Sequence, residues 1–336
     1  MRVRVRVPAT SANLGPGFDA LGLALALYNE VTLEEADRVS VAVEGEGSGR
    51  LDEGAKNVVA RGVVLAFEVA GRAFRGARVG CVNRIPLSRG LGSSAAAWVG
   101  GLVAANALMG EPLDRDALLA AATRAEGHPD NVAAAILGGL AVSCADGPRV
   151  TAVSLPVPRE IEWVVLVPET ESSTREARAV LPESVPRADA IFNVQRVSLL
   201  LAALGAGRAD LLAQAMQDRL HQPYRLRLFP WMDAVAAAGL EALPFPLLHE
   251  LIVFRAAGSG RGIGRQAADP LRDIVAHSGR QVSIDRSAGA QPARHERNGN
   301  DDCKMARADW HLRSVATSCG EIAQPDVAAR AYPLMR

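Results

Sequence analysis

Arginine and valine alternate at the start of the chain, from Arg2 to Val7. A period of two places successive side chains on opposite faces of a sheet, so the pattern predicts a half-buried strand over Val3 to Val7. Apolar segments over Leu21 to Leu33 and Val39 to Glu44 continue the strand pattern, and Arg78 to Ile85 forms a later one. The first part of the chain is therefore predicted to contain a sheet.

Apolar residues at helical spacing predict helices between these strands, over Asn57 to Ala70, Ser93 to Leu108 and Leu113 to Ala125. The second helix consists almost entirely of small and apolar residues, which is typical of a helix buried on most sides. Asp114 is expected to cap the third helix, and the pair Gly138-Gly139 precedes a further apolar strand. The first region is thus predicted to alternate strands with helices.

A second region begins near residue 156, where prolines bracket a predicted strand over Ile161 to Val167. Three helical patterns follow, over Ala188 to Leu204, Ala209 to Leu220 and Trp231 to Ala238. Beyond about residue 243 the texture changes, and residues 281–300 show no useful periodicity. We therefore predict a two-domain α+β protein, with domains over residues 1–155 and 156–280 and a tail of doubtful order over 281–336.

The charge composition limits which partners the protein is expected to bind. Among 336 residues, 37 lysines and arginines balance 37 aspartates and glutamates, so no global basic field attracts nucleic acid and any anion must be held locally. The N-terminus lacks the apolar run of a signal peptide, and no stretch approaches the roughly 18 consecutive apolar residues of a membrane span. We expect a cytoplasmic protein with no membrane partner. The four cysteines are too far apart for a metal or disulfide pattern: Cys81, Cys144, Cys303 and Cys319.

The most informative segment joins the strand ending at Ile85 to the helix beginning at Ser93. Glycines let the backbone approach a ligand closely, and the free amides of the following helix favour an anion in the turn. Serine hydroxyls add donors to phosphate and oxygen ligands for Mg²⁺. A glycine-serine turn taken alone is also a common helix cap. The segment consists of Pro86, Leu87, Ser88, Arg89, Gly90, Leu91, Gly92, Ser93, Ser94, Ala95 and Ala96.

This segment resembles the second motif of the GHMP kinases, the family of galactokinase, homoserine kinase, mevalonate kinase and phosphomevalonate kinase. The opening segment from Pro8 to Gly22 resembles the homoserine kinase branch specifically. Two later segments resemble substrate-side turns of the same branch, over Glu126 to Val132 and His221 to Arg225. The resemblance covers roughly residues 3 to 242. It implies a ribosomal-protein-like N-terminal domain with a left-handed crossover and a ferredoxin-like C-terminal domain.

The resemblance implies transfer of the γ-phosphoryl group of ATP to the hydroxyl of L-homoserine, on the route to threonine. Chemistry of this kind depends mostly on positioning and charge stabilisation. By resemblance, Ser94 and Glu126 would hold Mg²⁺, and Asn131 would join them as a catalytic residue. Asn57, at the start of a helix, would contact adenine. Homodimers are common in the family, so a homodimer is possible here.

The resemblance also places the amino-acid substrate. Its ammonium and hydroxyl ends would be surrounded by Asn13, Asp19, His128, Asp130 and Asn131. Arg178 and Arg225 would hold the carboxylate, because a guanidinium fork matches its two oxygens. Thr174 fits a hydroxyl-handling position nearby. By resemblance to the homoserine kinases, the substrate hydroxyl would attack without an enzyme base, so neither aspartate is assigned that role.

Simpler interpretations remain open for several of these residues. Glu126 could be a solvated residue at a helix end, and the two arginines could be surface charges. Asn57 could serve only as a helix cap, and His128 could be a structural histidine with satisfied hydrogen bonds. Each alternative predicts a different environment for the side chain.

One family feature is missing. No Ser-Gly-Ala-Gly-Pro-Ser motif follows Leu240; the chain instead continues with an apolar run over Leu251 to Phe254 and a glycine-rich stretch over Ala257 to Gly264. This stretch, followed by a helix-like pattern over Gln266 to His277, could be a divergent third motif. Alternatively, the reading frame departs from the ancestral one near residue 242. We favour the second explanation, which predicts a tail beyond about 280 that is poorly ordered or loosely packed.

Two other functions are considered. Another GHMP activity, such as a mevalonate-type kinase, would need fewer groups than the two arginines and the acidic residues offer together. A nucleotide-binding relative with little turnover would be explained by the missing third motif. Assays against homoserine, mevalonate and shikimate would separate the first, and ATP binding without product would reveal the second.

Overall fold

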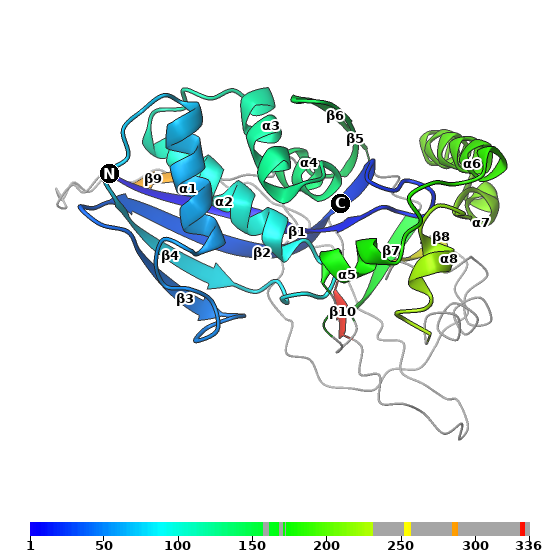
Figure 1. The fold of residues 1–336 in the computed structure, drawn as a ribbon, viewed down its shortest axis with the longest axis horizontal. Coiled ribbons are helices and arrows are strands. Elements are labelled where there is room, and N and C mark those ends of the chain that lie inside the picture. Colours follow the sequence, from blue (N-terminus) through cyan, green and yellow to red (C-terminus); the bar gives the residue numbers. More distant parts are fainter. Residues whose placement is uncertain are drawn as a thin grey trace, which may run out of the picture.

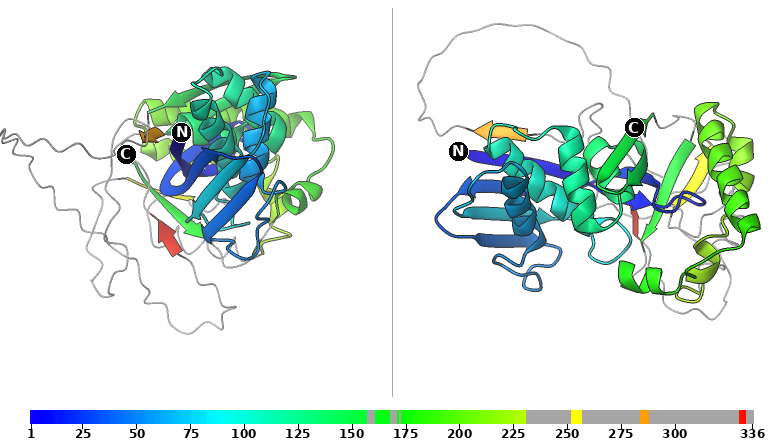
Figure 2. Two further views of the ribbon diagram at one scale, coloured as in Figure 1. Left: turned by 90° about the vertical axis from the view of Figure 1, so that its left-hand side faces the viewer. Right: turned by 45° about the horizontal axis from the view of Figure 1, so that its top comes forward.

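A computed structural model describes residues 1–156, 161–167, 171, 173–230, 252–256, 284–287 and 330–332. A larger sheet with helices packed against it forms one end of the molecule, and a smaller sheet with shorter helices forms the other (Figure 1). The views in Figure 2 show the same two parts from other sides. Because the two parts adjoin through the loop after the first strand, residues of both can face one site.

The larger sheet has seven strands. Their bounds are β1 Arg2–Ala12, β2 Leu21–Glu35, β3 Ser40–Gly45, β4 Ala77–Asn83, β5 Leu140–Asp146, β6 Arg149–Leu155 and β9 Ile284–Ser287. The order β3-β4-β2-β1-β9 is extended by β5, which pairs with both β2 and β6. All pairs are antiparallel except β3 with β4. The register between β1 and β2 shifts between Pro8 and Ala9, close to where the N–H of Thr10 donates to the carbonyl of Leu91.

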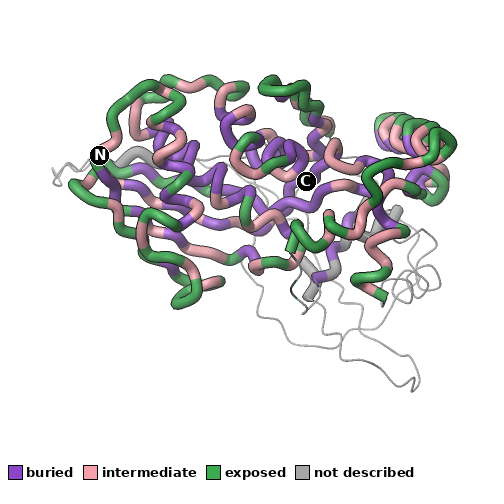
Figure 3. Tube along the Cα trace, in the orientation of Figure 1, coloured by how far each residue is buried: buried purple, intermediate pink, exposed green. Residues whose placement is uncertain are grey.

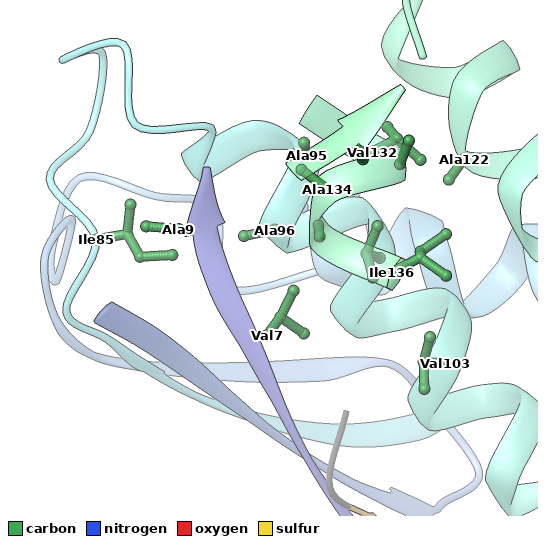
Figure 4. Close-up of a cluster of buried hydrophobic side chains, with 14 of the residues drawn as sticks. Val7, Ala9, Ile85, Ala95, Ala96, Val103, Ala122, Val132, Ala134 and Ile136 are labelled. Carbon is green, nitrogen blue, oxygen red and sulfur yellow. The ribbon is translucent and has the colours of Figure 1, made fainter. Parts of the chain in front are cut away.

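Four helices lie on one side of this sheet (Figure 1). They are α1 Val58–Val69, α2 Ser93–Leu108, α3 Arg115–Glu126 and α4 Asp130–Leu137. Buried side chains of β1, α2, α3 and α4 meet in the cluster of Figure 4, among them Val7, Val103, Ala122 and Val132. Figure 3 shows the same buried stripe running through α2 and the strands beneath it. The core therefore fixes where α2 and α4 begin, and the candidate site lies at those helix starts.

The smaller sheet has three strands, in the order β10-β7-β8. Its strands are β7 Ile161–Val167, β8 Ile252–Ala256 and β10 Arg330–Tyr332, and both pairs are antiparallel. The helical elements of this part are α5 Thr174–Ala179, α6 Arg187–Gly205, the 3₁₀ turn η1 Ala209–Leu211, α7 Leu212–Ala215 and α8 Gln222–Arg225. Their loops and short helices supply the second half of the site.

The α+β architecture and most predicted elements of residues 1–205 are confirmed, with bounds that differ by a few residues. Asp114 caps α3, since its side chain accepts the N–H of Ala117 at 2.8 Å. The periodicity did not reveal α4, α5, α8 or β6. Helices α4, α5 and α8 have eight, six and four residues, so a helical period barely develops within them.

The predicted helix over Ala209 to Leu220 is wrong beyond residue 215. The Asp218 carboxylate accepts the N–H groups of Leu220, His221 and Gln222 at 3.1, 2.9 and 2.7 Å. An aspartate that satisfies three backbone donors favours a turn over a continuing helix. This turn presents His221 and Arg225 to the loop after β1.

Several predictions fall outside the described residues. These are the helices over 231–238 and 266–277 and the glycine-rich stretch over 257–264. The apolar run near residue 252 is strand β8. Of the predicted tail, the structure describes only β9, which pairs with β1, and β10, which pairs with β7. Poor order elsewhere in the tail stays a prediction, and so does the change of reading frame.

Within the described part of the chain, only α6 is long and apolar enough to cross a membrane by length and composition. Asp189 of this helix pairs with Arg219 at 3.1 Å, and Arg196 lies 4.3 Å from the ring of Phe192. A single helix of this kind is weak support for a membrane span, and α6 carries these charged contacts along its length.

Candidate active site

Residues 86–96, named the phosphate loop from here on, lead from β4 into the first turn of α2. Ser88, Gly90 and Gly92 have φ angles of 56°, 72° and 64°, so three residues of this short loop adopt left-handed backbone. Only glycine accepts that region without a steric cost from Cβ. Gly92 is the N-cap of α2 and has no capping side chain, which leaves the first amides of the helix available to an anion.

Gly92 is also in close contact with two other parts of the site. A Cβ atom at this position would lie 2.0 Å from Oγ1 of Thr10 and 2.9 Å from Oδ1 of Asn131. Glycine is therefore required both by its backbone angle and by the space around it. The loop is further fixed by the N–H of Thr10, which donates to the carbonyl of Leu91 at 3.0 Å.

Ser94 and Glu126, the predicted metal ligands, are brought together. The Ser94 hydroxyl donates to Oε2 of Glu126 at 2.7 Å, across the start of α2 and the end of α3. Ser94 is exposed and Glu126 is half-buried, so both oxygens are open to a ligand. A hydroxyl and a carboxylate at this spacing suit Mg²⁺, which prefers oxygen ligands and keeps several waters.

His128 and Asp130 form a buried pair just before α4. Nδ1 of His128 lies 2.6 Å from Oδ1 of Asp130, and the same oxygen accepts the N–H of Asn131 at 2.7 Å. Burial lowers the pKa of His128, but the hydrogen bond and the charge of Asp130 outweigh it, so the pKa lies above its ordinary value. A buried histidine with this hydrogen bond is compatible with a structural role as well as with a substrate contact, so the role of His128 stays a prediction.

Asp19 completes this acidic group. One ligand atom each of Asp19, His128 and Asp130 lie within 4.8 Å of one another. Asp19 has a φ of 55°, and its N–H donates to Oδ1 of Asn13 at 3.0 Å. Asn13, with φ 71°, thus shapes the loop that carries Asp19 to the site.

Arg178 of α5 forms a bidentate pair with Asp19. Its Nη1 lies 3.0 Å from Oδ2, and its Nη2 makes the second contact to Oδ1. Arg225 of α8 lies on the same side, with Nε 3.4 Å from the carbonyl of Ala177. Both guanidinium groups contact one aromatic ring, that of Phe18, at 5.4 and 5.3 Å from its centroid. The two arginines are therefore partners in one site and not isolated surface charges.

His221 packs against Phe18, the ring that both arginines contact. Its ring is fully buried, stacks on Phe18 at 5.0 Å, and places Nε2 2.7 Å from the carbonyl of Gly15. Burial is the largest cause that lowers the pKa of His221 to about 4, so the ring is neutral at pH 7. Its Nδ1 then accepts from Nη1 of Arg225 at 3.3 Å.

Two predicted residues have other surroundings. Asn57 is buried and caps α1: its Oδ1 accepts the N–H of Val59 at 2.9 Å and its Nδ2 donates to the carbonyl of Asp52 at 2.8 Å. The structure thus supports the simpler interpretation of Asn57 as a cap, because both ends of its amide are occupied. Thr174 is exposed at the first turn of α5, next to the capping box of Ser173 and Glu176.

Arg89 of the phosphate loop has an incomplete set of partners. Its Nη2 lies 3.9 Å from Glu171, which also pairs with Arg50 at 3.3 Å. Its Nη1 is buried and has no hydrogen-bond partner among the described residues. A buried guanidinium nitrogen is costly to leave unpaired, so this donor suits a ligand oxygen.

Sequence reasoning did not single out Thr10, Phe18, Asp218 or Glu171. Thr10 and Phe18 lie inside the opening motif, where nothing in residue type distinguishes a hydroxyl that contacts Asn131 or a ring beneath two arginines. Asp218 precedes His221 by three residues, and an aspartate at that spacing is the one local signal that could have indicated a turn.

Comparison with known proteins identifies the family of the chain. The profile of the GHMP kinases N terminal domain matches residues 57–139. The chain is 49% identical over 238 residues to the homoserine kinase of Moorella thermoacetica, covering 71% of this chain and 80% of that one. It is also 49% identical over 267 residues to the homoserine kinase of Carboxydothermus hydrogenoformans, with coverage of 78% and 88%.

Solved structures give the same result. A crystal structure of homoserine kinase from Cytophaga hutchinsonii superposes with a TM-score of 0.67 at 32% identity, over 75% of this chain and 84% of that chain. The phosphomevalonate kinase of Streptococcus pneumoniae shares the fold alone, with a TM-score of 0.60 at 13% identity, over 77% and 93%.

The fold and the phosphate loop define a GHMP kinase. Within that family the chain belongs to the homoserine kinases. The partial coverage by its relatives is consistent with a resemblance that extends over roughly residues 3 to 242.

Proposed function

We propose that the enzyme transfers the γ-phosphoryl group of ATP to the side-chain hydroxyl of L-homoserine, forming O-phospho-L-homoserine, with the residue roles given below. One observation carries this assignment. Asn131 contacts the end of the phosphate loop through Thr10 and Gly92, and its N–H contacts Asp130 of the His128 pair. The two halves of the proposed phosphoryl-transfer site would therefore meet at one residue, Asn131, through its side chain on one side and its backbone N–H on the other.

The phosphate side would grip ATP with backbone and a few charges. The open amides at the start of α2 and the left-handed turn around Gly90 and Gly92 offer donors to phosphate oxygens. The unpaired Nη1 of Arg89 adds a charged donor from the same loop. Other residues of the predicted loop, from Pro86 to Ala96, would shape this cradle. Adenine contact at Asn57 is the least supported role, because its amide already caps α1.

Ser94 and Glu126 are the residues that would hold Mg²⁺. When bound there, the ion would neutralise charge on the β- and γ-phosphate oxygens. Glu126 supplies the negative charge of the pair, whereas the Ser94 hydroxyl supplies a neutral oxygen and loses its hydrogen bond to Glu126 on binding. Ser94 lies in the first turn of α2 and Glu126 is the last residue of α3, so the pair joins the two helices beside the phosphate loop.

The amino-acid side would recognise both ends of homoserine. Asp19, His128 and Asp130 have ligand atoms within 4.8 Å of one another, and the two carboxylates of this compact group would suit an ammonium ion. Arg178 and Arg225 would hold the carboxylate, so the bidentate pair between Arg178 and Asp19 would loosen when the substrate supplies its own carboxylate. Thr174, exposed at the start of α5, would lie near the hydroxyl end.

Catalysis by this arrangement is mainly positioning. Asn131 would orient the acceptor hydroxyl toward the γ-phosphorus, while the loop amides and Arg89 stabilise charge that develops on the transferred oxygens. The hydroxyl oxygen forms the new bond to phosphorus, the bond to the β,γ-bridging oxygen breaks, and ADP leaves. The hydroxyl proton leaves to solvent or phosphate, since no aspartate is assigned as a base.

A cytoplasmic location, Mg²⁺ dependence and a homodimer are parts of the proposal that rest on the family. Two alternatives remain to be tested against it: a mevalonate-type substrate, and ATP binding with little turnover.

The test is a parallel assay of homoserine, 3-aminopropan-1-ol, 4-hydroxybutanoate, mevalonate and shikimate with saturating magnesium-ATP. The first analogue lacks the carboxylate and the second lacks the ammonium group. We expect homoserine to react fastest and each analogue to lose at least about tenfold in kcat/KM, because each leaves charged protein groups unpaired. A preference for mevalonate or shikimate would overturn the proposal.

A further inference from the structure

We propose that Thr10 is a positioning residue for phosphoryl transfer: its buried hydroxyl fixes the side-chain amide of Asn131 and couples that amide to the phosphate loop. This inference rests on the proposed function of Asn131. It concerns a residue of β1 that contacts no predicted ligand group itself.

Thr10 lies near the end of β1 and is fully buried. Its Oγ1 donates to Oδ1 of Asn131 at 2.7 Å, although the two residues are 121 positions apart in the sequence. A buried hydroxyl needs a partner, and this contact supplies one. The hydrogen bond therefore stabilises one orientation of the Asn131 amide over its flipped alternative.

The orientation matters because an amide has two different ends. With Oδ1 held by Thr10, Nδ2 lies at the other end of the planar amide and points away from the Thr10 hydroxyl. Within the part of the chain that the structure describes, Nδ2 has no hydrogen-bond partner, and Asn131 is half-buried. The Nδ2 group therefore has a fixed orientation and a free hydrogen-bond donor. Such a donor suits the acceptor hydroxyl or a phosphate oxygen.

Thr10 also contacts the phosphate loop through its backbone. Its N–H donates to the carbonyl of Leu91 at 3.0 Å, one residue before Gly92. Gly92 approaches both Thr10 and Asn131 so closely that no side chain would fit there. A single strand residue thus sets the loop with its amide and the catalytic asparagine with its hydroxyl, which keeps the two at a constant separation.

Side-chain substitutions separate these two contacts. Thr10→Val keeps the shape and the backbone N–H but removes the hydroxyl, whereas Thr10→Ser keeps the hydroxyl. We expect kcat/KM for homoserine to fall about tenfold in Thr10→Val, from the lost hydrogen bond and the loosened Asn131. Thr10→Ser should recover most of the activity, and the Kd of ATP in calorimetry should stay within about twofold in both.

Thr123 is a matched control. It is a buried threonine of α3 whose Oγ1 has no hydrogen-bond partner within the described residues. Thr123→Val makes the same chemical change without breaking a contact, so it should leave kcat/KM and the Kd of ATP within about twofold of the wild type. A tenfold loss in this variant as well would mean that the effect comes from core packing, and would overturn the assignment.

A double-mutant cycle asks whether Thr10 acts through Asn131. If it does, Thr10→Val should cost nothing further in an Asn131→Ala background, because the side chain that it positions is gone. Losses that multiply in the double variant would contradict the inference. So would a loss of ATP affinity equal to the loss in kcat/KM.

One readout does not depend on activity. In protein labelled with ¹⁵N-asparagine, the Asn131 side-chain amide signal is identified by its loss in Asn131→Ala. We expect this signal to shift in Thr10→Val and to stay in place in Thr10→Ser. If the wild type makes no O-phosphohomoserine, the proposed function fails while this shift still tests Thr10; an unmoved signal in Thr10→Val overturns the role of Thr10 whatever the activity.

Discussion

The two sides of the proposed active site, one for phosphate and one for homoserine, are constructed differently. The phosphate side is one contiguous segment, residues 86–96, whose main contacts come from backbone in left-handed conformations and from the start of α2. The homoserine side collects side chains from the loop after β1, the start of α4, and the short helices α5 and α8. The first side depends on local geometry, and the second depends on how distant segments pack. Variants should therefore affect them differently.

The largest effect is expected at Glu126, the charged member of the proposed Mg²⁺ pair. Glu126→Gln keeps an oxygen near Ser94 but removes the negative charge, so kcat should fall by about a hundredfold to a thousandfold and the Mg²⁺ requirement should rise. Steady-state rates over a magnesium titration measure both quantities. Glu68→Gln, an exposed change on α1, is the control. Full activity of Glu126→Gln would show that Glu126 is only a solvated residue.

The next effect should be confined to the backbone side. In Gly92→Ala, the new Cβ would clash with Thr10 and Asn131, and the alanine would have to adopt a φ of 64°. We therefore expect about hundredfold weaker ATP binding in calorimetry. Gly110→Ala is the matched control, since Gly110 has φ 84° with nothing within 4 Å of a Cβ. The control carries the backbone strain alone and should keep its ATP affinity. Equal losses in both variants would contradict a backbone-built cradle.

A smaller effect should be confined to the side-chain side. Arg225→Ala removes one of the two guanidinium groups on Phe18, so the KM for homoserine should rise about thirtyfold with little change in kcat or in the Kd of ATP. Arg227→Ala, two residues further and exposed, serves as the control. A fall in kcat at unchanged KM would mean that Arg225 contacts the transferred group and not the substrate carboxylate.

The smallest expected effect concerns stability at acid pH. Because the folded protein lowers the pKa of His221 to about 4, the unfolded chain binds a proton first as the pH falls below about 6.5. Stability contributed by neutral His221 is therefore lost between pH 6.5 and 4, by about 2 kcal/mol at pH 5. In urea unfolding, His221→Gln should lose less stability than the wild type between pH 7 and 5.

The pH dependence of stability that we expect from His128 has the opposite sign to that of His221. Its pKa is raised in the folded protein, so its stabilisation is fully present below the unfolded pKa and is lost as the pH rises through the folded value. The stability gap between wild type and His128→Gln should therefore narrow from pH 6 to pH 8. Parallel pH profiles for the two histidine variants would contradict the assigned environments.

The contrast also explains what the sequence could predict. The phosphate loop was predicted from the residues alone, because glycines and a following helix act over a few positions. The pairing of Ser94 with Glu126, and the place of Arg178 and Arg225, came from family resemblance and depend on packing between segments far apart in the chain. No local pattern indicated that Phe18 lies beneath both arginines or that Thr10 contacts Asn131.

The predicted helix is wrong beyond residue 215 for a similar reason: a contact between distant segments overrides the local pattern. Helical spacing of apolar residues extends to Leu220, but the Asp218 side chain satisfies three backbone donors and Asn193 of α6 donates to it at 2.6 Å. A tertiary contact thus stabilises a turn against the local pattern. The turn is what brings His221 and Arg225 to Phe18, so the departure from periodicity lies at the functional site.

The central claim is that one intact site joins an ATP cradle to a homoserine pocket in this chain. The most direct measurement is ³¹P NMR of the purified full-length protein incubated with ATP, Mg²⁺ and L-homoserine. We predict a phosphomonoester signal that matches O-phospho-L-homoserine and grows in step with ADP. ATP binding in calorimetry without that signal, or with ADP formed and no phosphomonoester, would contradict it.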